Sequence, residues 1–119
     1  MCQFNQLNGL DVSKCSALTS LECGVNQLSS LDVSNNTALT FLACSSNQLI
    51  SIDLGNNSAL ETFYCDKNQL ISLDLSNNTA LNRVWCYSNP LLTEIWLKTG
   101  QTISTFTYDT GVATIKYKN

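Results

Sequence analysis

Apolar and polar positions in this chain follow a pattern that repeats every twenty-one residues. Each unit opens with Leu-x-x-Leu-x-Cys, or with a variant that has Phe or Val at the second leucine. Apolar and polar positions alternate there as in a short β-strand with one buried face. A second alternating segment, such as Leu31-Asp32-Val33, completes the unit. A fixed period of this length predicts a solenoid, whose coils stack and bury a shared apolar row.

Each coil is expected to contain two extended segments and very little helix. In the first segment Leu21 and Cys23 point inward and their neighbours outward, which predicts one strand per coil in a parallel front sheet. The second segment lies on the back, and turns rich in Asn and Ser follow it, as in residues 34–37. The inward Asn26 and its equivalents in later coils are expected to bond backbone groups at the first bend.

The first coil is incomplete. Cys2 stands at the position of the strand cysteine, but the Leu-x-x-Leu segment before it is absent. Because solenoids hide the apolar faces of their terminal coils under caps, the chain is expected to be the C-terminal part of a longer protein. Leu7, Leu10 and Val12 then have no coil above them, which predicts self-association through this uncapped N-terminal coil.

The pattern changes near the C-terminus. Pro90 replaces the glutamine of earlier coils, and one extra residue precedes the next alternating segment. Further on, alternation on both sides of Asp109-Thr110-Gly111 predicts a β-hairpin between residues 103–108 and 112–117, which would cover the open edge of the last coil. The expected regions are leucine-rich coils over residues 1–97 and a capping hairpin over residues 98–119.

Five of the six cysteines recur at one coil position: Cys2, Cys23, Cys44, Cys65 and Cys86. Equivalent positions on neighbouring parallel strands lie ~4.8 Å apart with side chains pointing the same way, which fits disulfide geometry poorly. The pattern favours buried free thiols that pack as small apolar residues. No metal site is predicted, because the chain has no histidine and no Cys-x-x-Cys pair.

A second column consists of aspartates on the back of the coils: Asp11, Asp32, Asp53 and Asp74. Aspartate before Ser and Asn commonly bonds to turn groups two or three residues further on, and this local role is the main interpretation. A calcium site is the alternative. Calcium needs about six to eight oxygen ligands, and one exposed column supplies too few.

Composition excludes several classes of function. With 119 residues, a net charge of −3 and 13% charged residues, the chain offers no basic surface for nucleic acid. No apolar run approaches the ~20 residues of a membrane-spanning helix, and the first residues lack the pattern of a signal peptide. Without histidine no Ser-His or Cys-His pair exists. We therefore predict no catalytic residue, no cofactor and no enzymatic activity.

Outward positions of the front sheet carry aromatic residues that packing does not require, and aromatic residues and Arg dominate protein interfaces. The residues predicted to bind a partner are Phe41, Tyr64, Asp66, Lys67, Arg83, Trp85 and Tyr87. Asp66 and Lys67 are expected at the edge of the aromatic residues, where they would orient the partner. Two other interpretations stay open: the rings stack only to stabilise the sheet, or Trp85 and Tyr87 form a platform for carbohydrate.

The unit Leu-x-x-Leu-x-Cys-x-x-Asn-x-Leu-x-x-Leu resembles the leucine-rich repeat, with cysteine in place of the third leucine. Over residues 2–97 its length and its cysteine column are similar to the cysteine-ladder repeats of bacterial surface proteins of the internalin group. The resemblance implies a curved, right-handed solenoid with a parallel sheet on its concave face. It also implies export to the cell surface and protein recognition by outward residues of that sheet.

The predicted role is accordingly a non-catalytic recognition module of a bacterial surface or secreted protein, with an unidentified protein as its ligand. A structural alternative is the capping fragment of a longer repeat protein, which would have no ligand of its own.

Overall fold

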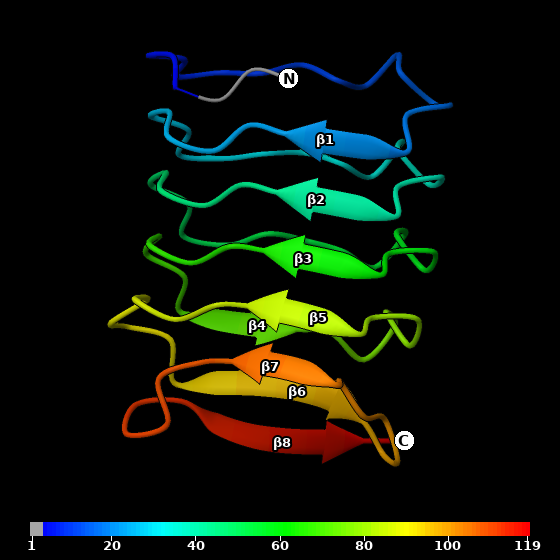
Figure 1. Cartoon of the computed structure of the whole chain (residues 1–119), viewed down its shortest axis with the longest axis vertical. Coiled ribbons are helices and arrows are strands. Elements are labelled where there is room, and N and C mark those ends of the chain that lie inside the picture. Colours follow the sequence, from blue (N-terminus) through cyan, green and yellow to red (C-terminus); the bar gives the residue numbers. More distant parts are fainter. Residues whose placement is uncertain (1–3) are drawn as a thin grey trace.

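The computed structural model describes residues 4–119, which form a solenoid of stacked coils (Figure 1). One side is a parallel sheet of five strands, the front sheet, in the order β1-β2-β3-β5-β7. Its strands are β1 (Ser20–Glu22), β2 (Phe41–Ala43), β3 (Thr62–Tyr64), β5 (Arg83–Trp85) and β7 (Thr105–Thr107). These described residues contain no helix, and so none that could cross a lipid bilayer.

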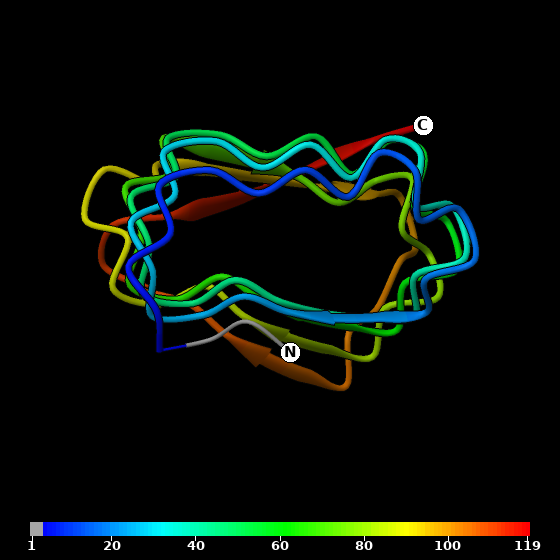
Figure 2. The ribbon, with the colours of Figure 1, turned by 90° about the horizontal axis from the view of Figure 1, so that it is seen from above.

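The opposite side of the solenoid carries a second parallel sheet, the back sheet, in the order β4-β6-β8. Its strands are β4 (Ser72–Asp74), β6 (Glu94–Lys98) and β8 (Thr114–Lys118). Seen from above, the two sides face each other across the interior and are joined by bends at both ends (Figure 2). Earlier coils follow the same path along the back without forming regular strands. The predicted solenoid with two extended segments per coil is confirmed.

The register of the front sheet follows the sequence period. Leu21 lies opposite Leu42, and Leu42 lies opposite Phe63. All three side chains are buried, with exposed fractions of 8%, 0% and 0%. Because successive residues of a strand point to opposite faces, the residues that flank them must point outward.

The ladder cysteines are core residues, as predicted. Cys23, Cys44, Cys65 and Cys86 are at most 1% exposed, and all four are free thiols. Burial, reinforced by neighbouring Cys23 and Asp66, raises the pKa of the Cys44 thiol well above its ordinary value, which keeps the sulfur neutral. Cys2 lies outside the described residues.

Asparagine side chains hold the bend that follows each front strand. The Nδ2 of Asn47 donates to the carbonyl oxygen of Cys44 in its own coil and to that of Cys23 in the coil before, at 3.0 Å each. Its Oδ1 accepts the N–H of Leu28 at 3.0 Å. Asn68 and its equivalent in the next coil repeat these bonds. The predicted role of these amides is confirmed, and it also ties each coil to its neighbour.

A second set of asparagines holds the opposite bend. The Nδ2 of Asn57 donates to the carbonyl oxygens of Val33 and Asn36 in the preceding coil, at 3.1 and 2.9 Å. In the last coil a glutamine takes this place, since the Nε2 of Gln101 donates to two carbonyl oxygens of its preceding coil at 3.1 and 3.0 Å. Side-chain amides therefore satisfy buried backbone groups at both ends of the coil.

The aspartate column has the predicted local role. The Oδ1 of Asp32 accepts the hydroxyl and the backbone N–H of Ser34, at 2.6 and 2.9 Å. These two bonds hold the pKa of Asp32 below its ordinary value. The other three aspartates also accept the backbone N–H of the residue two positions on: Asp11 that of Ser13, Asp53 that of Gly55 and Asp74 that of Ser76. Ser13 and Ser76 add a hydroxyl bond, which Gly55 cannot donate. No group of three or more potential metal-binding side chains occurs within residues 4–119.

The hairpin predicted for residues 103–108 and 112–117 is wrong. β7 pairs in parallel with β5 and β8 pairs in parallel with β6, so the two segments lie in opposite sheets. Their central residues Phe106 and Ile115 pack against the core of the solenoid. Two open sheet edges and the apolar end of the core stabilise these segments more than a marginal two-stranded hairpin would. Residues 98–119 thus add a coil.

The first coil is less covered than those that follow. Leu7 and Leu10 are partly buried, whereas the equivalent Leu28 and Leu31 are 0% and 7% exposed. Self-association through this coil stays a prediction.

Replacing a ladder cysteine tests the packing of the thiols. Cys44→Ser buries a hydroxyl in a column of thiols, which are weak hydrogen-bond acceptors, and should lower the free energy of unfolding by ~1–3 kcal/mol. The measurement is urea denaturation followed by circular dichroism. Cys15→Ser is the matched control: Cys15 is exposed, and its replacement should change stability by no more than ~0.5 kcal/mol. Equal losses in the two variants would contradict the buried column.

Removing one ladder amide tests the bend. Asn47→Ala leaves the N–H of Leu28 without its partner, whereas the carbonyl oxygens of Cys23 and Cys44 each keep one amide donor, from Asn26 and Asn68. Stability should therefore fall by ~1–3 kcal/mol, the cost of one buried unsatisfied donor. The control is Asn35→Ala, because Asn35 is exposed and donates a single bond of 3.2 Å to Ser13. That variant should lose less than ~1 kcal/mol in the same denaturation experiment.

Candidate functional site

The candidate site lies on the outer face of the front sheet. The pairing of Ala43 with Tyr64 and of Tyr64 with Trp85 places two aromatic side chains in one outward column. Phe41 precedes this column on β2, and Tyr87 follows it just after β5. We call these four residues, Phe41, Tyr64, Trp85 and Tyr87, the aromatic strip.

The rings of the aromatic strip are in continuous contact. The centroids of Tyr64 and Trp85 lie 4.3 Å apart with an interplanar angle of 21°, so these rings are stacked. Phe41 meets Tyr64 edge-on at 5.7 Å, and Tyr87 meets Trp85 at 6.5 Å with a tilt of 52°. Such pairs stabilise a surface by about 0.5–1.5 kcal/mol each beyond the area that they bury. All four side chains are half-buried, so the strip is supported from below and open from above.

Asp66 has a different environment from the one predicted. It is only 6% exposed, and its Oδ1 accepts the hydroxyl of Ser45 at 2.6 Å. The nearby Asp66 carboxylate, together with burial and a hydrogen bond between the two side chains, raises the pKa of Tyr87. Asp66 therefore positions the end of the aromatic strip rather than presenting a free carboxylate to a partner.

Lys67 and Arg83 lie beside the strip and are exposed. Arg83 is on β5 next to Thr62, in the outward column that contains Phe41. Lys67 occupies the bend, where one residue per coil has a positive φ: Phe4, Val25, Ser46, Lys67 and Ser88. Within residues 4–119 neither basic side chain forms a salt bridge, so both charges remain open to a partner.

A second aromatic centre, on the back sheet, was not predicted. The Nε1 of Trp96 donates to Glu94 at 3.2 Å, and Glu94 also accepts the ammonium of Lys116 at 3.0 Å. The ammonium groups of Lys116 and Lys118 each lie 5.6 Å from the centroid of the Trp96 ring. The alternation of apolar and polar residues along 94–98 and 114–118 was the feature of the sequence that could have located this centre. The predicted hairpin separated these segments, whereas the structure pairs them.

Comparison with known structures defines the class of fold. The functional domain of InlJ from Listeria monocytogenes, which includes a cysteine ladder, matches 90% of this chain with a TM-score of 0.63 and 27% sequence identity. The leucine-rich repeat domain of APL1B matches 84% with a TM-score of 0.53 and 18% identity, a likeness of fold alone. The chain spans 33% and 43% of the lengths of these two structures. No protein-family model and no curated protein matches the sequence.

The stacked coils and these likenesses define a leucine-rich repeat solenoid. Within that class, the buried cysteine column makes the chain internalin-like, since the InlJ domain has a cysteine ladder as well. Leucine-rich repeat domains are a non-enzymatic class of fold that typically mediates protein–protein recognition through extended surfaces.

The contact between Asp66 and Tyr87 can be tested by titration. Asp66→Asn removes the negative charge, so the pKa of Tyr87 should fall toward the ordinary tyrosine value of ~10. NMR of protein with isotope-labelled tyrosine would follow each phenol separately. Asp53→Asn, a change on the back of the solenoid, should leave Tyr87 unaffected. An unchanged pKa in the Asp66 variant would show that the two side chains are not in contact.

Proposed function

We propose that the chain is a recognition module that binds a protein partner through the aromatic strip. The observation that carries this proposal is the continuous contact of four half-buried rings across neighbouring coils, on a face that the core does not need. Aromatic side chains held in this way lose little conformational entropy when a partner covers them, and such groups commonly dominate interface energies. Arg83 and Lys67 flank the strip and supply charge for orientation.

The stacking favours a protein over a carbohydrate as the ligand. With centroids 4.3 Å apart along the column, Tyr64 and Trp85 each cover one face of the other ring. The stack therefore turns ring edges toward solvent. A sugar ring packs best on an open, flat aromatic face, whereas the side chains of a protein can fill the grooves between ring edges.

The proposed setting is a bacterial surface or secreted protein. Its support is the likeness to the InlJ domain, of which this chain spans 33%. The low charge of the chain is compatible with this role. The aromatic strip would supply the binding affinity, and electrostatic steering would contribute little.

The test starts from a partner isolated with the wild-type chain and then measures affinities with purified components. Trp85→Ala should weaken binding by at least ~30-fold, as expected for the centre of an interface. Tyr64→Ala should weaken it as well, and the double variant should abolish it. Both residues are half-buried and outward, so the variants should keep the circular dichroism spectrum of the wild type.

Trp96→Ala is the matched control, because it removes the same side chain from the opposite sheet. It should leave the affinity unchanged. Val84→Ala should instead lower stability, because Val84 is 0% exposed. A partner whose affinity survives the loss of both Tyr64 and Trp85 would contradict the proposed surface. Saturable binding of neutral oligosaccharides to the strip would favour the carbohydrate alternative.

A further inference from the structure

The first coil contains the single Asn-Gly pair of the sequence, Asn8-Gly9. The pair lies between the first bend and the back segment of this coil, outside any regular strand, and both residues are exposed. The equivalent pairs of the following coils differ: Ser29-Ser30, Ile50-Ser51 and Ile71-Ser72. The repeat therefore does not require an Asn-Gly pair here, and the pair gives the first coil a chemical property of its own.

An asparagine side chain can react with the backbone nitrogen of the residue that follows it. Once hydroxide has removed the proton from that nitrogen, the nitrogen attacks the side-chain carbonyl carbon Cγ. A new C–N bond closes a five-membered succinimide ring, and the side-chain nitrogen leaves as ammonia. Water then opens the ring at either carbonyl group, which yields aspartate or isoaspartate. A following glycine favours ring closure, because it has no Cβ beside the attacking nitrogen and adopts a wide range of φ and ψ.

The structure leaves this reaction unrestrained at Asn8-Gly9. Within residues 4–119 neither the side chain of Asn8 nor the N–H of Gly9 forms a hydrogen bond. The space beside Gly9 is open as well, since a Cβ placed there would have no heavy atom within 4 Å. The attacking nitrogen and the side chain that it attacks are therefore both accessible to solvent and free to approach each other.

The exposed asparagines of the later turns lack this freedom. Asn35 precedes Asn36, whose backbone N–H donates to the carbonyl oxygen of Val33 at 3.0 Å. The residues that follow Asn56 and Asn77 donate an equivalent bond, again at 3.0 Å. A backbone nitrogen that is fixed by a turn hydrogen bond is less able to lose its proton and to approach the preceding side chain. The Asn-rich turns therefore protect their own asparagines from the reaction.

We propose that Asn8 is a site of spontaneous deamidation in the folded chain, and that its isoaspartyl product loosens the first coil. The reaction needs only water and hydroxide, and it does not depend on a partner of the aromatic strip. The new carboxylate adds one negative charge to a chain whose net charge is −3.

The isoaspartyl product changes the spacing of the first coil. Its main chain runs through the former side-chain carbon, so one extra main-chain atom lies between Leu7 and Leu10. Both leucines pack against the core. Leu7 is fixed, because its N–H donates to Oδ1 of Asn26 at 3.1 Å and its carbonyl oxygen accepts the N–H of Gln27 at 2.7 Å. The displacement therefore falls on Leu10 and on the segment that follows it.

The test is storage of the full chain in mildly alkaline buffer, followed by peptide mass spectrometry at successive times. The rate at position 8 should rise in proportion to the hydroxide concentration. A short synthetic peptide of residues 5–13 gives the rate of the unrestrained reaction. The folded chain should react at no less than about one tenth of that rate, a barrier difference of at most about 1.4 kcal/mol. A slower reaction would overturn the proposal, as would equal conversion of Asn35, Asn56 or Asn77 in the folded chain.

Gly9→Ala is the matched variant. Its methyl group enters open space and Gly9 has no positive φ, so the variant should keep the melting curve of the wild type. Its conversion should still be at least about tenfold slower, because the methyl group hinders the attacking nitrogen. Gly111→Ala, which also enters open space but follows a threonine, should react as the wild type does. An unchanged rate in Gly9→Ala would overturn the proposal.

The loosening of the first coil is tested on the isoaspartyl form, separated by anion exchange. Hydrogen exchange of the first-coil amides should be at least about tenfold faster than in the unmodified chain, as expected for local opening. One such amide is the N–H of Cys15, which donates to the carbonyl oxygen of Val12 at 3.0 Å. Fresh Asn8→Asp adds the charge without the extra atom and should exchange as the wild type does. Equal exchange in the isoaspartyl form and in Asn8→Asp would overturn the proposed loosening.

Discussion

The hydrogen bonds of the buried asparagine amides set the geometry on which this solenoid depends. A chain that turns sharply leaves backbone N–H and carbonyl groups inside, where no water reaches them. The amide of Asn47 satisfies such groups in its own coil and in the coil before it. One side chain therefore fixes both the shape of the bend and the distance along the sequence to the next coil. An insertion between a front strand and its asparagine would therefore disrupt both the bend and the spacing of the coils.

The constant register has a consequence for the outer surface. Because equivalent residues of successive coils lie opposite each other, outward residues form columns whatever their identity. The core restricts the inward column to leucine, phenylalanine and valine, whereas the outward column is free to vary. Tyr64 and Trp85 stack for this reason, without any cost to the packing beneath them. Outward residues of the back sheet are equally free to vary, because they too lie outside the core. There Trp96 lies among the charged side chains of Glu94, Lys116 and Lys118.

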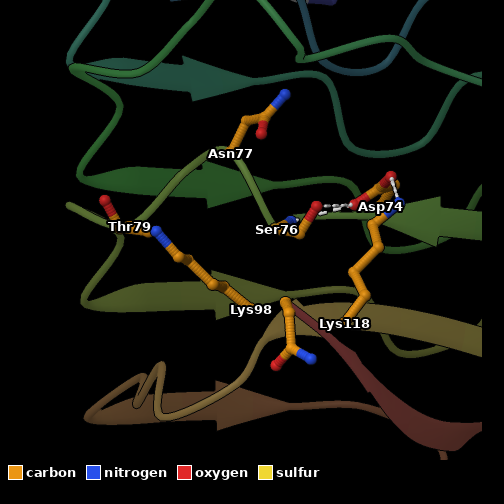
Figure 3. Close-up of a pocket in the computed structure, with 7 residues that line it drawn as sticks. Asp74, Ser76, Asn77, Thr79, Lys98 and Lys118 are labelled. Carbon is orange, nitrogen blue, oxygen red and sulfur yellow. Dashed lines mark hydrogen bonds and ion pairs between the residues drawn. The ribbon is translucent and has the colours of Figure 1, made fainter.

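The end of the repeat is the part of the molecule where new surfaces arise. After Asn78 the Asn-rich turn is not repeated, and Gln101 alone preserves the bonds to the preceding coil. A polar hollow lined in part by Asp74, Ser76, Lys98 and Lys118 opens where the stacked turns stop (Figure 3). Loss of periodicity thus keeps the core intact and changes only the exposed turns, the segments that most often carry binding residues.

The sequence by itself determined the period, the inward cysteines and asparagines, the local bonds of the aspartates and the columns of the front sheet. Each of these follows from local alternation combined with a fixed repeat. The tertiary structure alone decided the partners of the C-terminal strands, since alternation on both sides of Asp109 is the same for a hairpin and for a coil. Pairing with β5 and β6 was favoured because it buries Phe106 and Ile115 and closes two sheet edges. Likewise, the position of Asp66 at the edge of the aromatic strip predicted a carboxylate that is free to orient a partner. Its burial depended on Ser45, a neighbour that only the stacked coils bring within hydrogen-bonding distance.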